Sequence, residues 1–229
     1  MNTQDPQKPY IPDSSINASF NFGWKQMWKY FLYLFLVSII ITVLHVPISV
    51  TESFKDNITP GIVVLQVLGF FYWLLLFPIF SYGVDWMYLK AIRDQELDIK
   101  EMFIGFNNYV NIILAHLLAT AIIGIGFILL IVPGIFFACR LVFVPYIVMD
   151  RNLDAVKAVE KSWKMTEGHG WKIFGMGVLS FFIIVLGFIM LVVGLFPAAM
   201  WVSSAFASLY HSIDHQEKME LENGNGNGS

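Results

Sequence analysis

Long apolar stretches with almost no ionisable side chains constrain the fold of this chain more than any other feature. Residues 111–132 and 171–193 are two of them, and each reaches the roughly 20 residues that a helix needs to cross a bilayer. Only 14% of the 229 residues are charged, whereas a soluble domain carries about 25%. The net charge of −3 gives none of the basic character of a nucleic-acid-binding protein. We therefore expect an integral membrane protein, not a soluble enzyme, a nucleic-acid binder or a disordered chain.

Six apolar segments alternate with polar ones along the chain. They cover residues 30–50, 61–88, 111–132, 135–149, 171–193 and 198–210. The predicted fold class is all-α, a polytopic membrane bundle of six transmembrane helices arranged as three hairpins. The fourth and sixth segments are short, so re-entrant pieces are an alternative to full crossings there.

The same pattern divides the chain into three parts. We expect a polar N-terminal segment over residues 1–23 and a membrane domain over residues 24–211. Residues 212–229 end in an Asn-Gly repeat of low complexity, which predicts a disordered tail.

The distribution of Lys and Arg predicts the orientation in the membrane. With six spans, twelve of these residues lie on the side of the N-terminus and only Lys55 lies on the opposite side. Cytoplasmic loops carry an excess of Lys and Arg, so both termini are expected in the cytoplasm.

A repeated motif suggests three similar units. The pattern Ser-aromatic-x7-Trp-Lys-x-Phe begins at Ser19 and again at Ser162, and a looser version precedes the third span. We interpret each unit as a short amphipathic helix, a span, an outer turn and a returning span. The alternative is that Trp and Lys merely mark the membrane interface before any span.

Two of the short helices have clear sequence signals. Asp98, with Glu101 three residues later, is typical of a helix start. Residues 152–165 form an amphipathic pattern, with Asn152 as the expected N-cap. Its basic face consists of Lys157, Lys161 and Lys164. We expect these helices to be cytoplasmic and interfacial; they either dock lipid or a protein partner, or only seal the base of the bundle.

A series of motifs in the second half carries a family resemblance. The stretch Leu130-Ile-Val-Pro-Gly-Ile is followed by Arg140, Pro145 and Asp150, then by Ser162-Trp163 and Gly170-Trp171-Lys172. The chain resembles, over about residues 24–211, the uncharacterised bacterial six-span membrane proteins related to the glycerophosphoryl diester phosphodiesterase membrane domain. In relatives with phosphodiesterase activity, catalysis belongs to a separate soluble domain. Only 19 residues follow the sixth span here, so the resemblance implies a membrane module of a bacterial inner membrane, with no activity carried over.

Arg140 and Asp85 are the embedded charges, and they are the candidate ligand- or headgroup-binding residues. A charge within a span costs about 2.5–3.5 kcal/mol on insertion scales, so it normally faces protein, water or a headgroup. Arg140 either binds an anionic group, caps carbonyls exposed at helix breaks, or reaches outward to the interface. Asp85 either pairs with Arg140 or reaches the inner interface. The expected helix breaks are at Pro133 with Gly134, and at Pro145.

No catalytic constellation is visible, and we expect neither an enzyme nor a metal or cofactor site. Cys139 is the only cysteine, which excludes an intramolecular disulfide. Small residues at Ala199, Ser203 and Ala207 recur every four residues and suit close helix packing, within the chain or in a homo-oligomer.

The function that follows is a non-enzymatic membrane module, a scaffold or accessory subunit that binds membrane lipids or a cytoplasmic protein partner. The alternative is a small transporter or lipid-handling protein with a cavity around Arg140, because broken helices and an embedded charge are typical of such sites.

Overall fold

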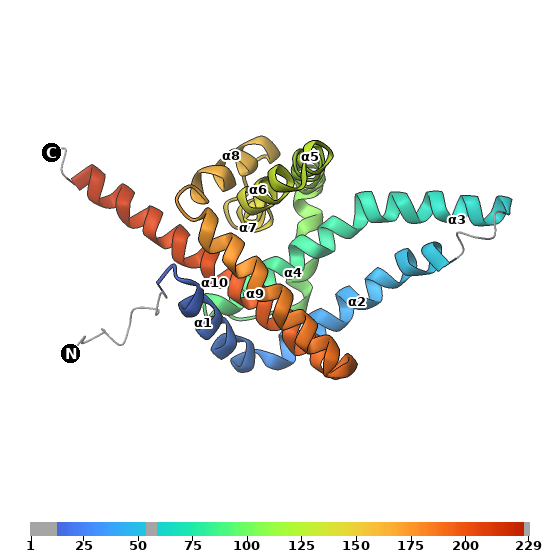
Figure 1. Ribbon diagram of the computed structural model, residues 1–229, viewed down its shortest axis with the longest axis horizontal. Coiled ribbons are helices and arrows are strands. Elements are labelled where there is room, and N and C mark those ends of the chain that lie inside the picture. The colour runs from blue at the N-terminus through green and yellow to red at the C-terminus, as the bar shows by residue number, and fades with distance from the viewer. Residues whose placement is uncertain (1–12, 54–58, 227–229) are drawn as a thin grey trace. The chain divides into compact units, whose positions relative to one another are not determined.

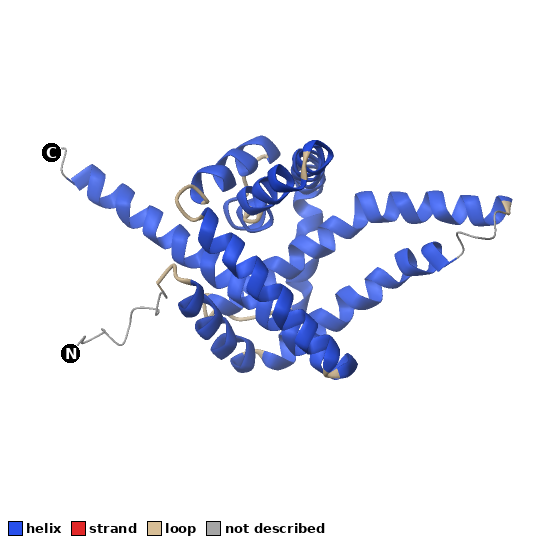
Figure 2. Cartoon of the chain, in the orientation of Figure 1, coloured by secondary structure: helices blue, strands red, loops and turns tan. Residues whose placement is uncertain are grey.

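In the computed structural model, the described backbone covers residues 13–53 and 59–226, and every element in it is a helix (Figures 1 and 2). Side chains are described for these residues except at 46–53, 191–193 and 224–226. Residues 1–12 of the predicted N-terminal segment, and Lys55 in the predicted outer loop, lie outside this part. In chain order the elements are α1 (Ile16–Lys29), α2 (Phe31–Ser53), α3 (Pro60–Phe71), the π-helical η1 (Tyr72–Leu76), α4 (Phe77–Ile92), the 3-10 helix η2 (Ile99–Asn108), α5 (Tyr109–Leu129), α6 (Ile131–Leu141), α7 (Val144–Arg151), α8 (Ala155–Met165), α9 (Gly170–Ile189) and α10 (Leu191–Gly226).

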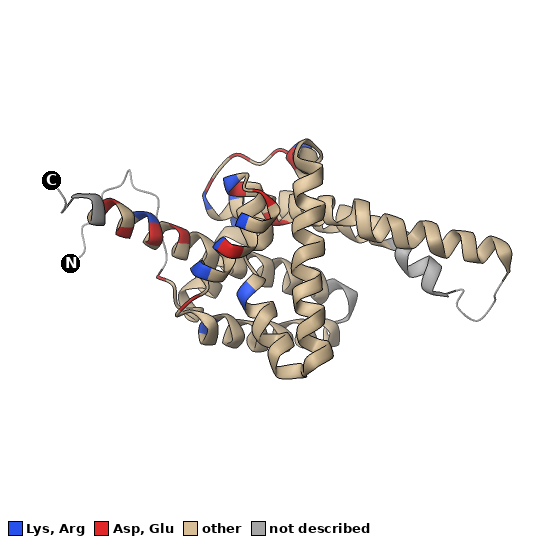
Figure 3. Cartoon of the chain, turned by 90° about the horizontal axis from the view of Figure 1, so that it is seen from above, with Lys and Arg blue, Asp and Glu red and all other residues tan. Residues whose placement is uncertain are grey.

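Several helical stretches are long and apolar enough to cross a membrane, and Figure 3 shows the long runs of helix without charged residues. There are four in the described residues: Pro60–Ile92, Ile99–Leu129, Ile131–Arg151 and Gly170–Ile189. A fifth is added if Ile16–Lys29 and Phe31–His45 form one broken span. The all-helical class is thus confirmed together with four or five helices suited to crossing a membrane. The count of six and the three-hairpin arrangement stay predictions.

The sequence suggested a helix break at Pro133 with Gly134. In the structure the break lies earlier, at Leu130. Leu130 is extended (φ −167°, ψ 159°), and α6 begins with the next residue. Pro133 therefore occupies the first turn of α6, where backbone N–H groups have no intrahelical partner and a proline is tolerated. With this earlier start, the stretch Ile131–Arg151 has 21 residues, which is long enough for a full crossing.

A second break lies just before Pro145, the position predicted from the sequence. Val142 and Phe143 separate α6 from α7, and Pro145 is the second residue of α7. Its fixed φ and missing N–H suit this position.

The last helix differs from the prediction at both ends. The turn after α9 lies at Met190, so Pro197 is inside α10 and not in a turn over residues 194–197. Gly194 instead contacts Gly187 of α9, where an added Cβ would lie 2.9 Å from the Gly194 carbonyl oxygen. At the other end, residues 212–226 are helical where a disordered tail was expected. Glu, Lys, Met and Leu favour a helix there, and Lys218 Nζ bonds the Asp214 carboxylate one turn earlier (2.7 Å).

The chain divides into two compact units. Unit 1 contains Met1–Phe31, Tyr88–Leu97 and Trp171–Ser229, and unit 2 contains Leu32–Met87 and Asp98–Gly170. In unit 1, α1 packs on α10, where Trp201 Nε1 donates to the Phe20 carbonyl (2.9 Å). In unit 2, the elements η2, α6, α7 and α8 all pack against α5.

An ion pair lies at the end of the apolar part of α10 in unit 1. Asp214 is only 2% exposed, and Arg93 Nη2 lies 3.4 Å from its carboxylate. Since a buried carboxylate is costly without partners, Arg93 and Lys218 stabilise the charged form of Asp214.

The α5–α6 contact of unit 2 depends on two glycines. A Cβ added at Gly126 would lie 2.6 Å from Phe137 Cδ2 and 2.9 Å from Gly134 Cα. Close helix approach through small residues is a common packing device in membranes. Gly134 is therefore a contact residue and not a helix breaker.

Gly126→Ala should lower the thermal stability of the purified protein in detergent, because the added methyl group has no room and overpacking costs about 1–3 kcal/mol. Gly124 provides a matched control on the same helix, since nothing lies within 4 Å of a Cβ added there. Gly124→Ala should be neutral or stabilising by about 0.5–1 kcal/mol, from the helix preference of alanine. Equal melting temperatures of the two variants would contradict the close contact.

Candidate functional site

Asp154 is the N-cap of α8, and not Asn152, the N-cap expected from the sequence. The Asp154 carboxylate accepts from the Lys157 backbone N–H (3.0 Å), whereas Asn152 adopts a left-handed conformation (φ 50°) at the end of α7. Asparagine tolerates this conformation better than most residues, which explains its place in the turn between two helices.

Helix α8 has a buried face of small residues and an exposed face with lysines, as its amphipathic pattern predicts. The buried side consists of small and flexible residues, namely Ala155, Ala158, Ser162 and Met165. Val156, although apolar, is 57% exposed. The exposed side carries Lys157 and Lys164, with Lys161 half-buried, and Glu160 lies among these lysines. The basic face is thus present, but Glu160 lowers its net positive charge by one.

The lysines of this face are not equivalent. Lys157 Nζ lies 2.7 Å from the Asp154 carboxylate, and this hydrogen bond raises the pKa of Lys157 and lowers the pKa of Asp154. The Lys164 side chain is exposed and forms no hydrogen bond or ion pair with any other described residue. Lys164 is therefore better placed than Lys157 to meet an external anion.

The Arg140 side chain lies against α8. Its guanidinium carbon is 5.1 Å from the centroid of the Phe136 ring and 5.5 Å from that of Trp163. Its Nη1 approaches the Trp163 carbonyl oxygen at 3.5 Å, in the last turn of α8. A cation at a helix C-terminus interacts favourably with the exposed carbonyls. Arg140 thus caps a helix end, but at the C-terminus of α8 and not at the breaks near Pro133 and Pro145 that the sequence suggested.

The backbone of Arg140 is held by α8 in return. Its carbonyl oxygen accepts from Ser162 Oγ (2.8 Å). Thr166 Oγ1 lies beside it (3.3 Å) but is closer to the carbonyl oxygens of Ser162 (2.9 Å) and Trp163 (3.0 Å). The Arg140 carbonyl belongs to the last turn of α6, where the helix leaves such groups without intrahelical partners. Arg140, Ser162, Trp163 and Thr166 thus join α6 to α8 in both directions, and we call these four residues the Arg140 clamp.

Asp85 and Arg140 are not brought together. Asp85 is half-buried in α4, and the part of the chain that the structure describes offers it no hydrogen bond or ion pair. The Arg140 guanidinium meets Trp163 and Phe136 instead. Nor do the described residues contain a group of three or more His, Cys, Asp or Glu side chains that could hold a metal ion.

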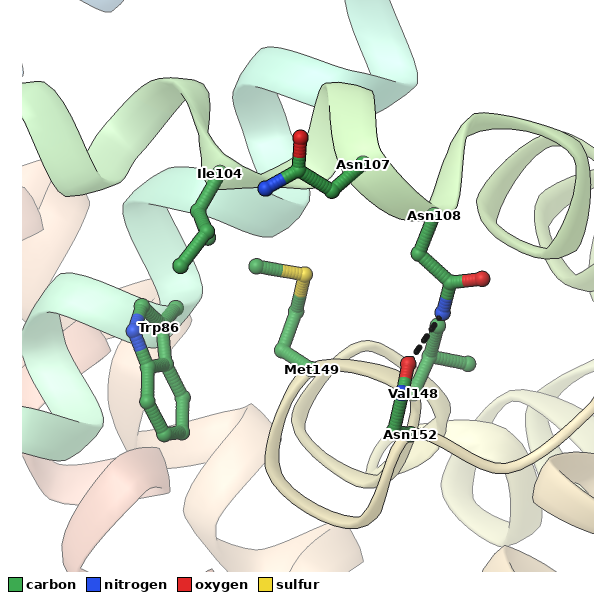
Figure 4. Close-up of a pocket in the computed structure, with 7 residues that line it drawn as sticks. All are labelled: Trp86, Ile104, Asn107, Asn108, Val148, Met149 and Asn152. Atoms are coloured by element: carbon green, nitrogen blue, oxygen red, sulfur yellow. Dashed lines mark hydrogen bonds between the residues drawn. The ribbon is translucent and has the colours of Figure 1, made fainter.

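Unit 2 contains a surface cleft that was not expected from the sequence (Figure 4). Its volume is about 370 Å³, and it is lined by Trp86, Ile104, Asn107, Asn108, Val148, Met149 and Asn152. Asn108 Nδ2 donates to Asn152 Oδ1 (2.8 Å) across one end of it. The only sequence signal was the occurrence of asparagines at two boundaries of apolar segments, and their meeting depends on how η2 and α7 pack on α5.

Comparison with protein families places the second half of the chain. A family model described as "Domain of unknown function (DUF7847)" matches residues 97–214. The chain belongs to this family. The DUF7847 match starts just before η2 and ends in α10, so it contains the Arg140 clamp and every cleft residue except Trp86. No curated protein and no solved structure matches the chain. None of these comparisons links it to the glycerophosphoryl diester phosphodiesterase membrane domain.

Arg140→Met should destabilise the protein by about 1–3 kcal/mol, because it removes a cationic donor from the end of α8 and leaves the Trp163 carbonyl less satisfied. Thermal unfolding in detergent measures this effect. Lys164→Met removes an exposed charge from the same region and should change stability by no more than about 0.5 kcal/mol. An unchanged melting temperature of Arg140→Met, combined with loss of a bound anion, would contradict the capping role and favour a ligand site.

Proposed function

We propose that this protein is a non-catalytic, multi-pass membrane module that binds anionic membrane lipid through α8. The observation that carries the proposal is the way in which α8 is held by the neighbouring helices. Its small side chains are buried against α5, α6 and α7, and the Arg140 clamp joins it to α6. Lys157 and Lys164 therefore face outward. A helix fixed in this way presents its charges in one orientation.

The charge of the exposed face supports lipid headgroups as the ligand. Near an anionic leaflet each Lys contributes about 1 kcal/mol of attraction. Lys161 and Lys164 add to this attraction, Glu160 opposes it, and Lys157 shares its charge with Asp154. The expected affinity is therefore modest and depends on ionic strength.

The topology belongs to the same proposal. Six spans as three hairpins, with both termini in the cytoplasm, place α8 at the inner leaflet, where anionic lipids are found. The excess of Lys and Arg on one side of the chain supports this orientation. A bacterial inner membrane and a relation to the glycerophosphoryl diester phosphodiesterase membrane domain are proposed on the motif resemblance alone.

A second candidate function places an anionic ligand at Arg140, as in a small transporter or lipid-handling protein. One observation favours it: Arg140 Nε is buried and has no hydrogen-bond partner among the described residues. A cytoplasmic protein partner and self-association through the faces of Ala199, Ser203 and Ala207 are further proposals, which the experiment below also addresses.

Lys161→Gln combined with Lys164→Gln should reduce retention of phosphatidylglycerol, because two charges at about 1 kcal/mol each correspond to a loss of about 5- to 30-fold. Native mass spectrometry of the detergent-purified protein, with phosphatidylglycerol and phosphatidylcholine added separately, counts the bound lipids. Glu160→Gln should have the opposite effect, a gain of about fivefold.

The matched control is Lys25→Gln combined with Lys100→Gln, which changes the net charge equally at two other exposed lysines. Equal losses in both double variants would refute the α8 site. A co-purifying polypeptide that is lost in the α8 variant would instead identify a protein partner as the ligand of this face.

A further inference from the structure

The cleft of unit 2 combines amide groups with apolar walls and has no charged lining residue. Ile104, Asn107 and Asn108 come from η2, Trp86 comes from α4, and Val148, Met149 and Asn152 come from α7 and its C-terminal end. Small-molecule sites commonly have volumes of about 300–1,000 Å³, apolar walls and a few fixed polar groups. The volume of about 370 Å³ falls in this range.

A chain of amides fixes one end of the cleft. Asn111 Nδ2 donates to Asn108 Oδ1 (2.8 Å), and Asn108 Nδ2 donates to Asn152 Oδ1 (2.8 Å). The Asn152 Nδ2 group remains available, because it has no partner among the described residues. The Asn107 amide also forms no hydrogen bond within the described chain. In Figure 4 Asn107 and Asn152 lie on different sides of the cleft, so two amides can approach one ligand from two directions.

The chemistry of these groups selects against an anion. An amide offers both donors and an acceptor, which matches a hydroxyl group that also donates and accepts. A phosphate or carboxylate offers acceptors only and is normally met by Arg or Lys, and none lines this cleft. The ligand class that fits is therefore uncharged and hydroxylated.

The opposite wall of the cleft is apolar. The Trp86 indole, Ile104 and Met149 lie away from the Asn108–Asn152 pair (Figure 4). A sugar ring has hydroxyl groups along its edge and C–H groups on its faces, so it can bond amides at its edge and pack a face on an indole ring or aliphatic side chains.

The position of the cleft along the chain indicates a lipid as the source of such a group. Asn107 and Asn108 directly precede α5, and Asn152 directly follows α7, so the lining amides lie at the ends of two helices. In the six-span topology proposed above, on which this step rests, these helix ends lie at the level of the lipid headgroups. Ile104 and Phe103 are 45% and 44% exposed on η2, which gives acyl chains an apolar surface next to the cleft.

We infer that this cleft binds the headgroup of an uncharged glycolipid, with sugar hydroxyls on Asn107 and Asn152 and the ring on the Trp86 side. The site does not involve the lysines of α8, so it is separate from the anionic-lipid function proposed above.

The test uses the full chain purified in lauryldimethylamine oxide, a detergent without a sugar headgroup. Monoglucosyl-dioleoylglycerol, dioleoylglycerol and phosphatidylglycerol are titrated separately and followed by native mass spectrometry. The glucolipid should bind with saturable 1:1 stoichiometry and at least tenfold more tightly than dioleoylglycerol. Asn107→Leu and Asn152→Gly should each weaken it by about three- to tenfold, the effect of a lost hydrogen bond. Glycine at residue 152 keeps the left-handed conformation available (φ 50°) and removes only the amide.

Asn17→Leu in α1 is the matched control, since Asn17 is also exposed and close to the end of a helix, and it should bind the glucolipid like the wild type. Circular dichroism and melting temperature confirm that each variant is folded. Phosphatidylglycerol retention should fall only in the α8 lysine variant, and glucolipid binding only in the cleft variants.

Three results would overturn the inference. Equal affinity for dioleoylglycerol would show that the headgroup is not recognised, and full glucolipid binding by folded cleft variants would place it elsewhere. Displacement of the glucolipid by methyl glucoside at the same concentration would make the ligand a free sugar and not a lipid.

Discussion

A helix that cannot continue through Pro145 determines how unit 2 is built. Pro145 has no N–H for the Leu141 carbonyl, and the turn before it ends α6, so the carbonyls of the last turn of α6 require other donors in a chain that is otherwise apolar there. Ser162 of α8 donates its hydroxyl group to the Arg140 carbonyl, and the Arg140 side chain approaches the Trp163 carbonyl in return. Because each helix contributes a donor and an acceptor, separating the two helices removes a hydrogen bond from a carbonyl of each.

The same exchange explains why α8 is so poor in large apolar residues on its buried side. Ala158 and Ser162 are fully buried, and their small size lets the α8 backbone approach α5, α6 and α7. Gly126 and Gly134 allow the same approach between α5 and α6. In lipid the hydrophobic effect does not favour one helix arrangement over another, because lipid tails are as apolar as the side chains. Close backbone contact and hydrogen bonds therefore determine how the helices pack.

The sequence predicted what depends on one segment and missed what depends on several. The all-helical class and the Pro145 break follow from apolar length and from the chemistry of one residue. The N-cap role of Asp98 is also confirmed, since its carboxylate accepts from the Lys100 N–H (3.0 Å). The sequence did not identify Leu130 as the break, because a proline such as Pro133 is tolerated both in the first turn of a helix and just beyond a helix end. Asn152 was wrong as an N-cap because Asp154, two residues later, competes for the same role. Only the tertiary packing of η2 and α7 on α5 brings Asn108 and Asn152 together, so no local pattern predicted the cleft.

Helix α10 has a mechanical consequence. Its 36 residues run without interruption from the apolar stretch that contains Trp201 into the charged segment beyond Tyr210. At a rise of about 1.5 Å per residue, residues 211–226 extend about 24 Å past Tyr210 as part of one rod. The rod is held near Tyr210 by the pair of Arg93 with the buried Asp214. The charged residues beyond Tyr210 are therefore carried in a direction set by the apolar part of α10, without an intervening hinge.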